Sequence, residues 1–294
     1  MVNTKTLRIV EPAGRPDAEA LARNIQDLEQ QGFRVLYDPI EYDSTWPYNG
    51  GPMHTRAEAL TNALCERESD YTLAARGGHG ASDVLPLLDW DRLATAEPKC
   101  LLGLSDVTAI QSALHTKLGW HSLHTTMPGG SLWDVSCDDV KQLMRLLHSG
   151  LPWRGEIQLD SGQLSGKIEG TLFGGCFAVL TSLIATPYLA KTFDDTILFL
   201  EDVNESPGRL MRFWNQWQQS GMTLGIKAIL LGHFAGLDKN NNEDAREKVI
   251  AEFQRRCHCP VLSTTQFGHC SPSFALGIGA VGRIENNYLS WEIV

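Results

Sequence analysis

The first half of the chain alternates short apolar runs with segments whose apolar residues recur at helical spacing. Apolar runs predict four strands, at 7–10, 33–36, 71–75 and 100–104. Helical spacing predicts four helices, one between a cap at Asp17 and Gly32, and others near 55–66, 82–88 and 106–118. Strands that alternate with helices are joined by right-handed crossovers, so this half predicts an α/β fold with a parallel, doubly wound sheet.

The pattern weakens around 149–166, where Gly and Ser are frequent. We therefore divide the chain into an N-terminal domain of residues 1–152, a linker of 153–165 and a C-terminal domain of 166–294. The C-terminal part has fewer clean units of strand and helix. Its pattern predicts, in order, a helix near 175–185, a strand at 196–200, a helix at 207–219, a strand at 228–232, a helix near 243–256, a strand at 261–264 and two closing strands near 280–293.

Charge and composition exclude several classes of protein. The 294 residues carry a formal net charge of -10, which argues against a nucleic-acid backbone or an anionic membrane as the main partner. No apolar run approaches the roughly 18 residues that a membrane-spanning helix needs. The first residues lack the apolar stretch of a secretory signal. We expect a cytoplasmic protein with neither a membrane nor a nucleic acid as partner.

The seven cysteines form no disulfide framework, because their number is odd and their spacing is irregular. We expect reduced thiols. A zinc site is the alternative, since Cys257, His258 and Cys259 are followed by His269 and Cys270. This spacing fits none of the usual zinc-ligand patterns, so we expect no metal.

A serine stands at the junction between the predicted strand at 100–104 and the helix that follows. Ser105 would project there from the carboxyl edge of a parallel sheet, where ligand crevices form. The helix start offers free backbone N–H groups, and that of Asp106 is the obvious donor to an oxyanion. Val107 stands where the G-x-S-x-G elbow of α/β-hydrolases has its second Gly. Two interpretations remain open, a catalytic nucleophile and a simple helix cap.

Three more predicted strands lead into segments that could carry chemistry. The glycines of Arg76-Gly77-Gly78-His79-Gly80 let the backbone approach a ligand, although a tight turn is the alternative. Glu201 could orient an imidazole, or could belong to a solvated polar loop. His269 could be catalytic or structural. The order Ser, Glu, His, with each at a strand end, is compatible with a triad assembled by folding.

At these same residues the chain resembles the LD-carboxypeptidases, also called muramoyltetrapeptide carboxypeptidases. The resemblance covers essentially the whole chain, and its motifs occur in the family's order. They are ARGGHGASDVLPLLDW (75–90), GLSDVTAIQSAL (103–114), EGTLFGGCFAVLTSLIATPY (169–188), ILFLEDVNESPGRLMR (197–212) and FGHCSPSFALGIG (267–279).

The resemblance implies a flavodoxin-like N-terminal domain that carries the nucleophile, Ser105. A smaller α/β C-terminal domain would supply Glu201 as the acid of the triad and His269 as the general base, with the active site between the two domains. The backbone N–H groups of Asp106 and Gly78 would form the oxyanion hole. The resemblance also implies a homodimer and no metal or organic cofactor.

Two positions depart from the family pattern. Cys176 follows the paired glycines where the family often has Asn, so we treat Cys176 as a candidate substrate-binding position. The opening motif, usually of an Ala-Pro-Ser-Gly type, reads EPAG at 11–14. Arg76 adjoins the glycine turn and is a candidate to hold the free carboxylate of a substrate, because a guanidinium binds carboxylates in a bidentate manner.

The activity implied is that of a serine carboxypeptidase of peptidoglycan recycling, which releases the terminal D-Ala of a murein tetrapeptide by cleaving an L-D peptide bond. One alternative is a microcin-C immunity type of peptidase, which hydrolyses an amide in a peptidyl- or aminoacyl-nucleotide. Its pocket should stack the base on aromatic residues, for which Trp133 and Trp153 are candidates. A second alternative is a non-catalytic protein that binds muropeptides.

Overall fold

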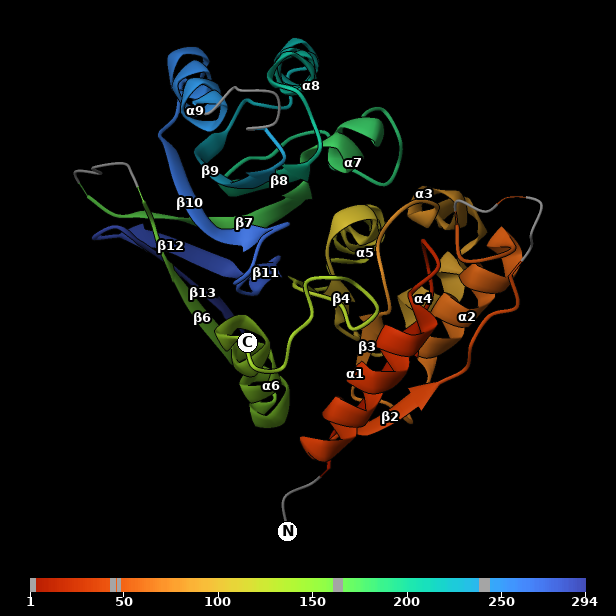
Figure 1. The fold of residues 1–294 in the computed structure, drawn as a ribbon. Helices are drawn as coiled ribbons and strands as arrows, with labels where there is room; N and C mark the ends of the chain where they lie inside the picture. Colours follow the sequence, from red (N-terminus) through yellow and green to blue (C-terminus); the bar gives the residue numbers. More distant parts are fainter. Residues whose placement is uncertain (1–3, 43–45, 47–48, 161–165, 238–243) are drawn as a thin grey trace.

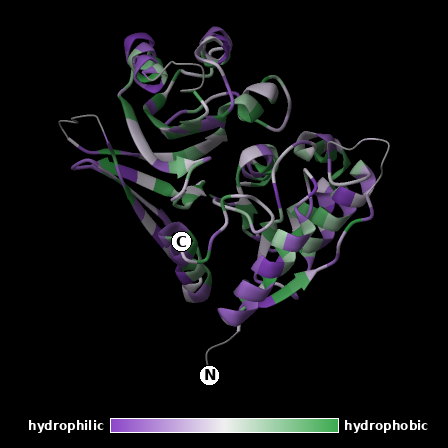
Figure 2. Cartoon of the chain, viewed as in Figure 1, coloured by the Kyte–Doolittle hydropathy of each residue, from purple (hydrophilic) through white to green (hydrophobic). Residues whose placement is uncertain are grey.

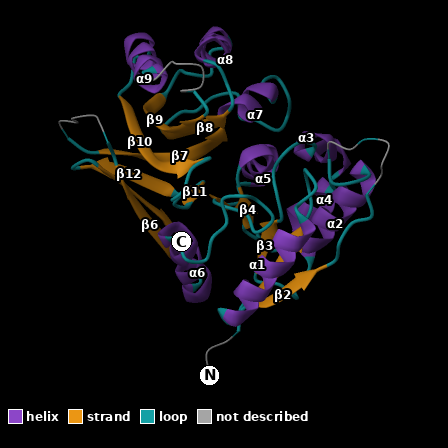
Figure 3. Ribbon diagram, viewed as in Figure 1, coloured by secondary structure: helices purple, strands orange, loops and turns teal. Residues whose placement is uncertain are grey.

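The structure is a computed structural model that describes residues 4–42, 46, 49–160, 166–237 and 244–294. These residues form two β-sheets that lie side by side, each accompanied by helices (Figure 1 and Figure 3). The predicted α/β class, with a parallel N-terminal sheet and a second α/β unit, is confirmed.

The first sheet has six strands in the order β11-β5-β4-β3-β1-β2. Five strands from the N-terminal half run parallel, and β11 pairs antiparallel with β5 at one edge. The strands are β1 (Thr6–Val10), β2 (Arg34–Tyr37), β3 (Tyr71–Ala74), β4 (Leu101–Gly103), β5 (Ser122–His124) and β11 (Leu276–Ile278).

Four helices of this half follow the predicted periodicity, whereas the two at 90–95 and 138–149 were not predicted. The first begins where expected, because the Asp17 side chain accepts a hydrogen bond from the Ala20 N–H at 2.9 Å. It buries Leu21 and Leu28 against the sheet, on the apolar stripe that predicted it. The helices are α1 (Ala18–Gln30), α2 (Met53–Cys65), α3 (Ala81–Val84), α4 (Trp90–Thr95), α5 (Thr108–Leu118) and α6 (Asp138–Ser149).

The second sheet has seven strands in the order β10-β9-β8-β7-β12-β13-β6. Its first four strands are parallel and the remaining three are antiparallel. The strands are β6 (Trp153–Gln158), β7 (Ile168–Cys176), β8 (Thr196–Val203), β9 (Ile226–Ala235), β10 (Val261–Gly268), β12 (Val281–Glu285) and β13 (Tyr288–Ile293). The helices beside it are α7 (Phe177–Ser182), α8 (Pro207–Gln219) and α9 (Ala245–Arg256).

Two features differ from the predicted division of the chain. Residues 153–158, assigned to the linker, form β6, which pairs along its whole length with β13. The pattern failed there because β6 is an edge strand that buries only Trp153 and Ile157. In addition, β11 comes from the C-terminal half but joins the first sheet. The remaining linker residues 161–165 lie outside the described residues, and the domain limits themselves stay a prediction.

The helix after Ser105 connects the two halves. α5 packs against β7 and α7, and its Thr108 Oγ1 accepts a hydrogen bond from the Cys176 N–H at 3.2 Å. Apolar residues concentrate in the strands and the inner helix faces, while polar residues cover the outer faces (Figure 2). None of the described helices has both the length and the apolar content needed to cross a bilayer.

Candidate active site

Ser105 lies in a 3₁₀ turn, Ser105–Val107, between β4 and α5, as the sequence predicted. Its φ of +64° is in the left-handed region, which a residue with a side chain rarely occupies. Such strain clusters at functional sites, where the surrounding structure holds it in place. The strained turn therefore distinguishes Ser105 from an ordinary helix cap, whose backbone is extended.

The glycine turn after β3 lies directly against Ser105. The Gly14 N–H donates to the Gly77 carbonyl at 2.8 Å, and Gly78 has a φ of +106°. The Asp106 carboxylate accepts from the Ala81 N–H at 2.7 Å, which ties the segment after the glycines to the serine turn. The backbones of Gly78 and Asp106, the two predicted oxyanion donors, thus belong to segments that are joined to one another.

Arg56 holds the other side of this turn. Its guanidinium is fully buried and donates to the carbonyls of Pro12 and Gly80, each at 2.7 Å, and to that of Gly51 at 2.9 Å. It also forms an ion pair with Asp83 at 3.3 Å. One buried side chain therefore fixes three loops around the glycine turn.

Glu201 and His269 form a close pair. The Nδ1 of His269, which follows β10, lies 2.6 Å from the Oε2 of Glu201 in β8. Burial favours the uncharged acid, but the charge and hydrogen bond of His269 outweigh it and lower the pKa of Glu201 below its ordinary value. Burial likewise opposes protonation of His269, but Glu201 and then Asp202 raise its pKa above the ordinary value. A carboxylate so placed fixes the imidazole tautomer and stabilises its protonated form.

A cavity of about 550 Å³ brings the predicted residues together. Its wall includes Ser105, His269, Gly78 and Arg76, with Glu201 buried behind the imidazole. Within the described chain, Ser105 and His269 share this wall without a hydrogen bond between them. Hydrogen bonds of this kind are often long in unliganded enzymes and tighten when substrate binds.

The two predicted substrate-binding residues are placed differently. Arg76 lines the cavity, and its Nη1 donates to the Arg15 carbonyl at 2.7 Å, which leaves further donors for a ligand. Cys176 is buried outside the wall, with its thiol 3.5 Å from the Asp202 carboxylate. Cys176 could therefore influence a substrate only through the groups that it packs against.

Much of the remaining wall of the cavity was not predicted from the sequence. This wall follows β5, a strand that was not predicted, and comprises Thr126, Met127, Gly129, Gly130, Ser131 and Leu132. The signal that could have revealed it is the Pro-Gly-Gly stretch at 128–130, because Pro and Gly mark turns. Asp17 and Ala20, at the start of α1, also line the cavity.

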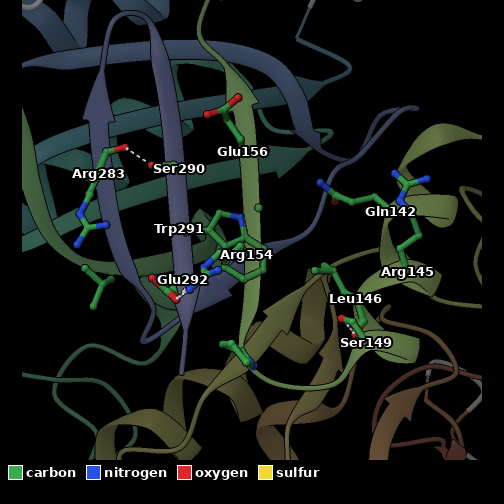
Figure 4. A pocket seen from close by; sticks show the side chains of 13 residues that line it. Gln142, Arg145, Leu146, Ser149, Arg154, Glu156, Arg283, Ser290, Trp291 and Glu292 are labelled. Carbon is green, nitrogen blue, oxygen red and sulfur yellow. Dashed lines mark hydrogen bonds and ion pairs between the residues drawn. The ribbon is translucent and has the colours of Figure 1, made fainter. Parts of the chain in front are cut away.

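A larger groove of about 800 Å³ lies between α6 and the antiparallel end of the second sheet (Figure 4). It contains none of the predicted site residues. Arg154 pairs there with Glu292 at 2.5 Å, and the Ser290 hydroxyl lies 3.5 Å from the Arg283 carbonyl. No His or Cys among the described residues lines this groove, whereas Ser105 and His269 share the smaller cavity, which is therefore the candidate active site.

No three His, Cys, Asp or Glu side chains converge as metal ligands would, within the ranges that the structure describes. His269 is engaged with Glu201, whereas Cys257, His258 and Cys259 line a separate pocket beside α8. The expectation that the protein needs no metal stays a prediction.

A strained serine turn and a Glu–His pair beside one cavity between two α/β units form an arrangement that serine hydrolases use. The family comparisons agree. Residues 7–125 match the LD-carboxypeptidase N-terminal domain, and residues 169–284 match the LD-carboxypeptidase C-terminal domain. The chain therefore belongs to the LD-carboxypeptidase family.

Its relatives include murein peptide carboxypeptidases and a microcin self-immunity protein. The murein tetrapeptide carboxypeptidase of Pseudomonas aeruginosa is 28% identical, over 96% of this chain and 94% of its own. A probable murein peptide carboxypeptidase of Bacillus subtilis is 29% identical, over 94% of this chain and 87% of its own. The microcin C7 self-immunity protein of Escherichia coli is 22% identical, over 87% of this chain and 83% of its own.

Solved structures share the fold over the whole chain. The muramoyltetrapeptide carboxypeptidase of Oxalobacter formigenes has a TM-score of 0.82 and 24% identity, and covers 98% of both chains. The MccF protein in complex with glutamyl sulfamoyl guanosine has a TM-score of 0.85 and 18% identity, and covers 100% of this chain and 97% of its own. At these identities the similarity concerns the fold alone.

Proposed function

We propose that this protein is a serine carboxypeptidase that releases the terminal D-Ala of murein tetrapeptides by cleaving an L-D peptide bond. Ser105 is the nucleophile, His269 the general base and Glu201 the residue that orients the base. The observation that carries the proposal is the shared cavity wall of Ser105 and His269, with His269 held by Glu201 at 2.6 Å.

The reaction is an acyl transfer in two steps. His269 takes the proton of the Ser105 hydroxyl, and the resulting alkoxide attacks the carbonyl carbon of the scissile bond. The N–H groups of Asp106 and Gly78 receive the oxyanion. The C–N bond then breaks as His269 returns the proton to the amine of D-Ala. Water, activated by His269, hydrolyses the ester and restores the Ser105 hydroxyl.

An exopeptidase must also recognise the free carboxylate of its substrate. Arg76 is our candidate, because it lines the cavity beside Gly77 and Gly78 and its guanidinium is not fully used by the Arg15 carbonyl. Cys176 is a weaker candidate, because its thiol is buried against Asp202. We propose that Cys176 affects substrate preference indirectly, through the packing of the wall.

The microcin-C immunity type of activity is the second candidate, because a microcin self-immunity protein is among the relatives beside the murein peptide carboxypeptidases. The proposed stacking residues do not favour it. Trp153 is buried in the core, and its indole N–H donates to the Leu146 carbonyl at 2.7 Å. Trp133 is also buried, and no Phe, Tyr or Trp among the described residues lines the cavity. A nucleobase would need such a face to stack on.

The test compares two substrates directly. Mass spectrometry of a murein tetrapeptide digest should show the loss of a single D-Ala, whereas an aminoacyl sulfamoyl adenosine should remain intact. Cleavage of the nucleotide conjugate alone would favour the second candidate. A fluorophosphonate probe that labels Ser105 would exclude a non-catalytic, muropeptide-binding role, and absence of both labelling and turnover would support that role.

We further propose, from the family resemblance, that the protein is a cytoplasmic homodimer. Light scattering coupled to size-exclusion chromatography measures the mass in solution, and a single 32.5 kDa species would contradict the dimer. Cell fractionation tests the compartment.

A further inference from the structure

The two oxygens of Glu201 have different surroundings. Oε2 lies 2.6 Å from the Nδ1 of His269, whereas Oε1 has no hydrogen-bond partner although the whole side chain is buried. A buried carboxylate without partners on one oxygen is costly, and such groups normally find a donor.

A second imidazole faces this unpaired oxygen. The Nε2 of His124, the last residue of β5, lies 3.8 Å from Glu201 Oε1. His124 is fully buried, and neither of its ring nitrogens has a hydrogen-bond partner. The rings of Phe199 and Phe267 pack edge-on against it, with centroids 5.4 Å and 6.4 Å away. The unpaired donor and the unpaired acceptor are thus held opposite one another by apolar walls.

We propose that His124 is a positioning residue for Glu201, whose Nε2–H donates to Oε1 and thereby keeps Oε2 directed at His269. The inference rests on the proposed function and deepens it, because it adds a fourth member behind the catalytic residues. The 3.8 Å separation is slightly longer than a hydrogen bond, and a small rotation of either side chain brings Nε2 within hydrogen-bond distance of Oε1.

The charge state of His124 suits this role. The pKa of His124 is lowered to about 4, mainly because the ring is buried. The charge of Glu201 raises this pKa in part, and His269 lowers it further. At neutral pH the ring is therefore uncharged and offers one N–H. These two residues are the titratable groups that act on it, Glu201 from β8 and His269 from the end of β10.

The test uses two variants and a matched control. His124→Leu removes the donor, and His124→Gln keeps an N–H near the position of Nε2. Ser122→Ala is the control, because Ser122 is buried two residues earlier on β5 and its hydroxyl also lacks a hydrogen-bond partner. Circular dichroism and thermal melting confirm that each variant folds.

The readouts are the pH profile of kcat/KM on a murein tetrapeptide and the titration of His269 by nuclear magnetic resonance in the free protein. Without the donor, the carboxylate charge concentrates on Oε2 and raises the proton affinity of the Glu201–His269 pair. His124→Leu should lower kcat by about tenfold with little change in KM, and should move the acidic limb and the His269 titration up by roughly 0.5 pH unit. His124→Gln should restore most of the kcat and most of the His269 titration, and Ser122→Ala should resemble the wild type in both.

The inference is overturned if His124→Leu leaves the His269 titration unchanged, whether or not the rate falls. It is equally overturned if Ser122→Ala and His124→Leu lower kcat to the same extent, because both would then act through the packing of β5. If the wild-type protein releases no D-Ala, the proposed function fails, but the titration of His269 still decides the role of His124.

Discussion

Gly77 and Ser105 lie so close together that a Cβ atom on Gly77 would stand 2.7 Å from the Ser105 Cβ and 3.0 Å from its Oγ. The contact joins the end of β3 to the turn after β4, and neither residue can shift without moving the other. The turn that carries the strained φ of Ser105 therefore fits against residue 77 only because this residue has no side chain.

The first prediction concerns this contact. Gly77→Ala should displace Ser105 and lower kcat/KM by at least about 100-fold, because misplacement of a reacting group by about 1 Å has effects of that size. Steady-state kinetics on a murein tetrapeptide checks it. The matched control is Gly208→Ala, since a Cβ there meets no atom within 4 Å, and this variant should keep its activity. Equal activity of the two variants would show that the contact does not position Ser105.

The second prediction concerns pH. His269 must be unprotonated to act as a base, and Glu201 raises its pKa above 6.5, so kcat/KM should fall as the pH drops through that raised value. Glu201→Gln removes the charge that raises the pKa. The acidic limb should then move to lower pH, while kcat falls by roughly 10³-fold. A limb that stays in place in the pH–rate profile would refute the coupling of the two residues.

The third prediction concerns recognition of the substrate carboxylate. Arg76→Ala should raise KM by about tenfold and leave kcat nearly unchanged, because the guanidinium contacts the substrate away from the reacting bond. Arg76→Lys should lie between Arg76→Ala and the wild type, since an ammonium lacks the planar fork. Arg67→Ala is the control, as the side chain of Arg67 is 86% exposed and does not line the cavity. An unchanged KM for Arg76→Ala would remove Arg76 from this role.

The fourth prediction concerns stability. Arg56→Met leaves the carbonyls of Pro12, Gly51 and Gly80 without their buried donor, so the free energy of unfolding should fall by about 3 kcal/mol. Arg34→Met, at an exposed ion pair with Glu68, should cost less than about 1 kcal/mol. Denaturant titrations measure both. A loss of similar size in the two variants would contradict the organising role of Arg56.

The candidate site was predictable in part because its residues follow buried apolar runs. Ser105 follows β4, Glu201 lies near the end of β8 and His269 follows β10, and each run is long enough or apolar enough to indicate a strand. Local patterns could not show that these ends meet. Glu201 and His269 are 68 residues apart, and Ser105 follows a strand of the other sheet, so their meeting depends on tertiary packing.

Other features escaped for identifiable reasons. β5 contains three residues, too few for a period to emerge, so His124 and the cavity wall after it were missed. β11 is equally short, and no local pattern indicates that this strand from the C-terminal half pairs with β5 in the first sheet. α6 is the exception, because it buries Val140, Leu143 and Leu147 at helical spacing and could have been predicted.

The central claim is that the Ser105 hydroxyl attacks the bond before a terminal D-Ala. The most direct measurement is D-Ala release from a murein tetrapeptide, followed by mass spectrometry, for the wild type and Ser105→Ala at equal protein concentration. We predict stoichiometric loss of one D-Ala with the wild type, and a rate lower by at least about 10⁴-fold with the folded variant. Release at a near-native rate by Ser105→Ala would contradict the account.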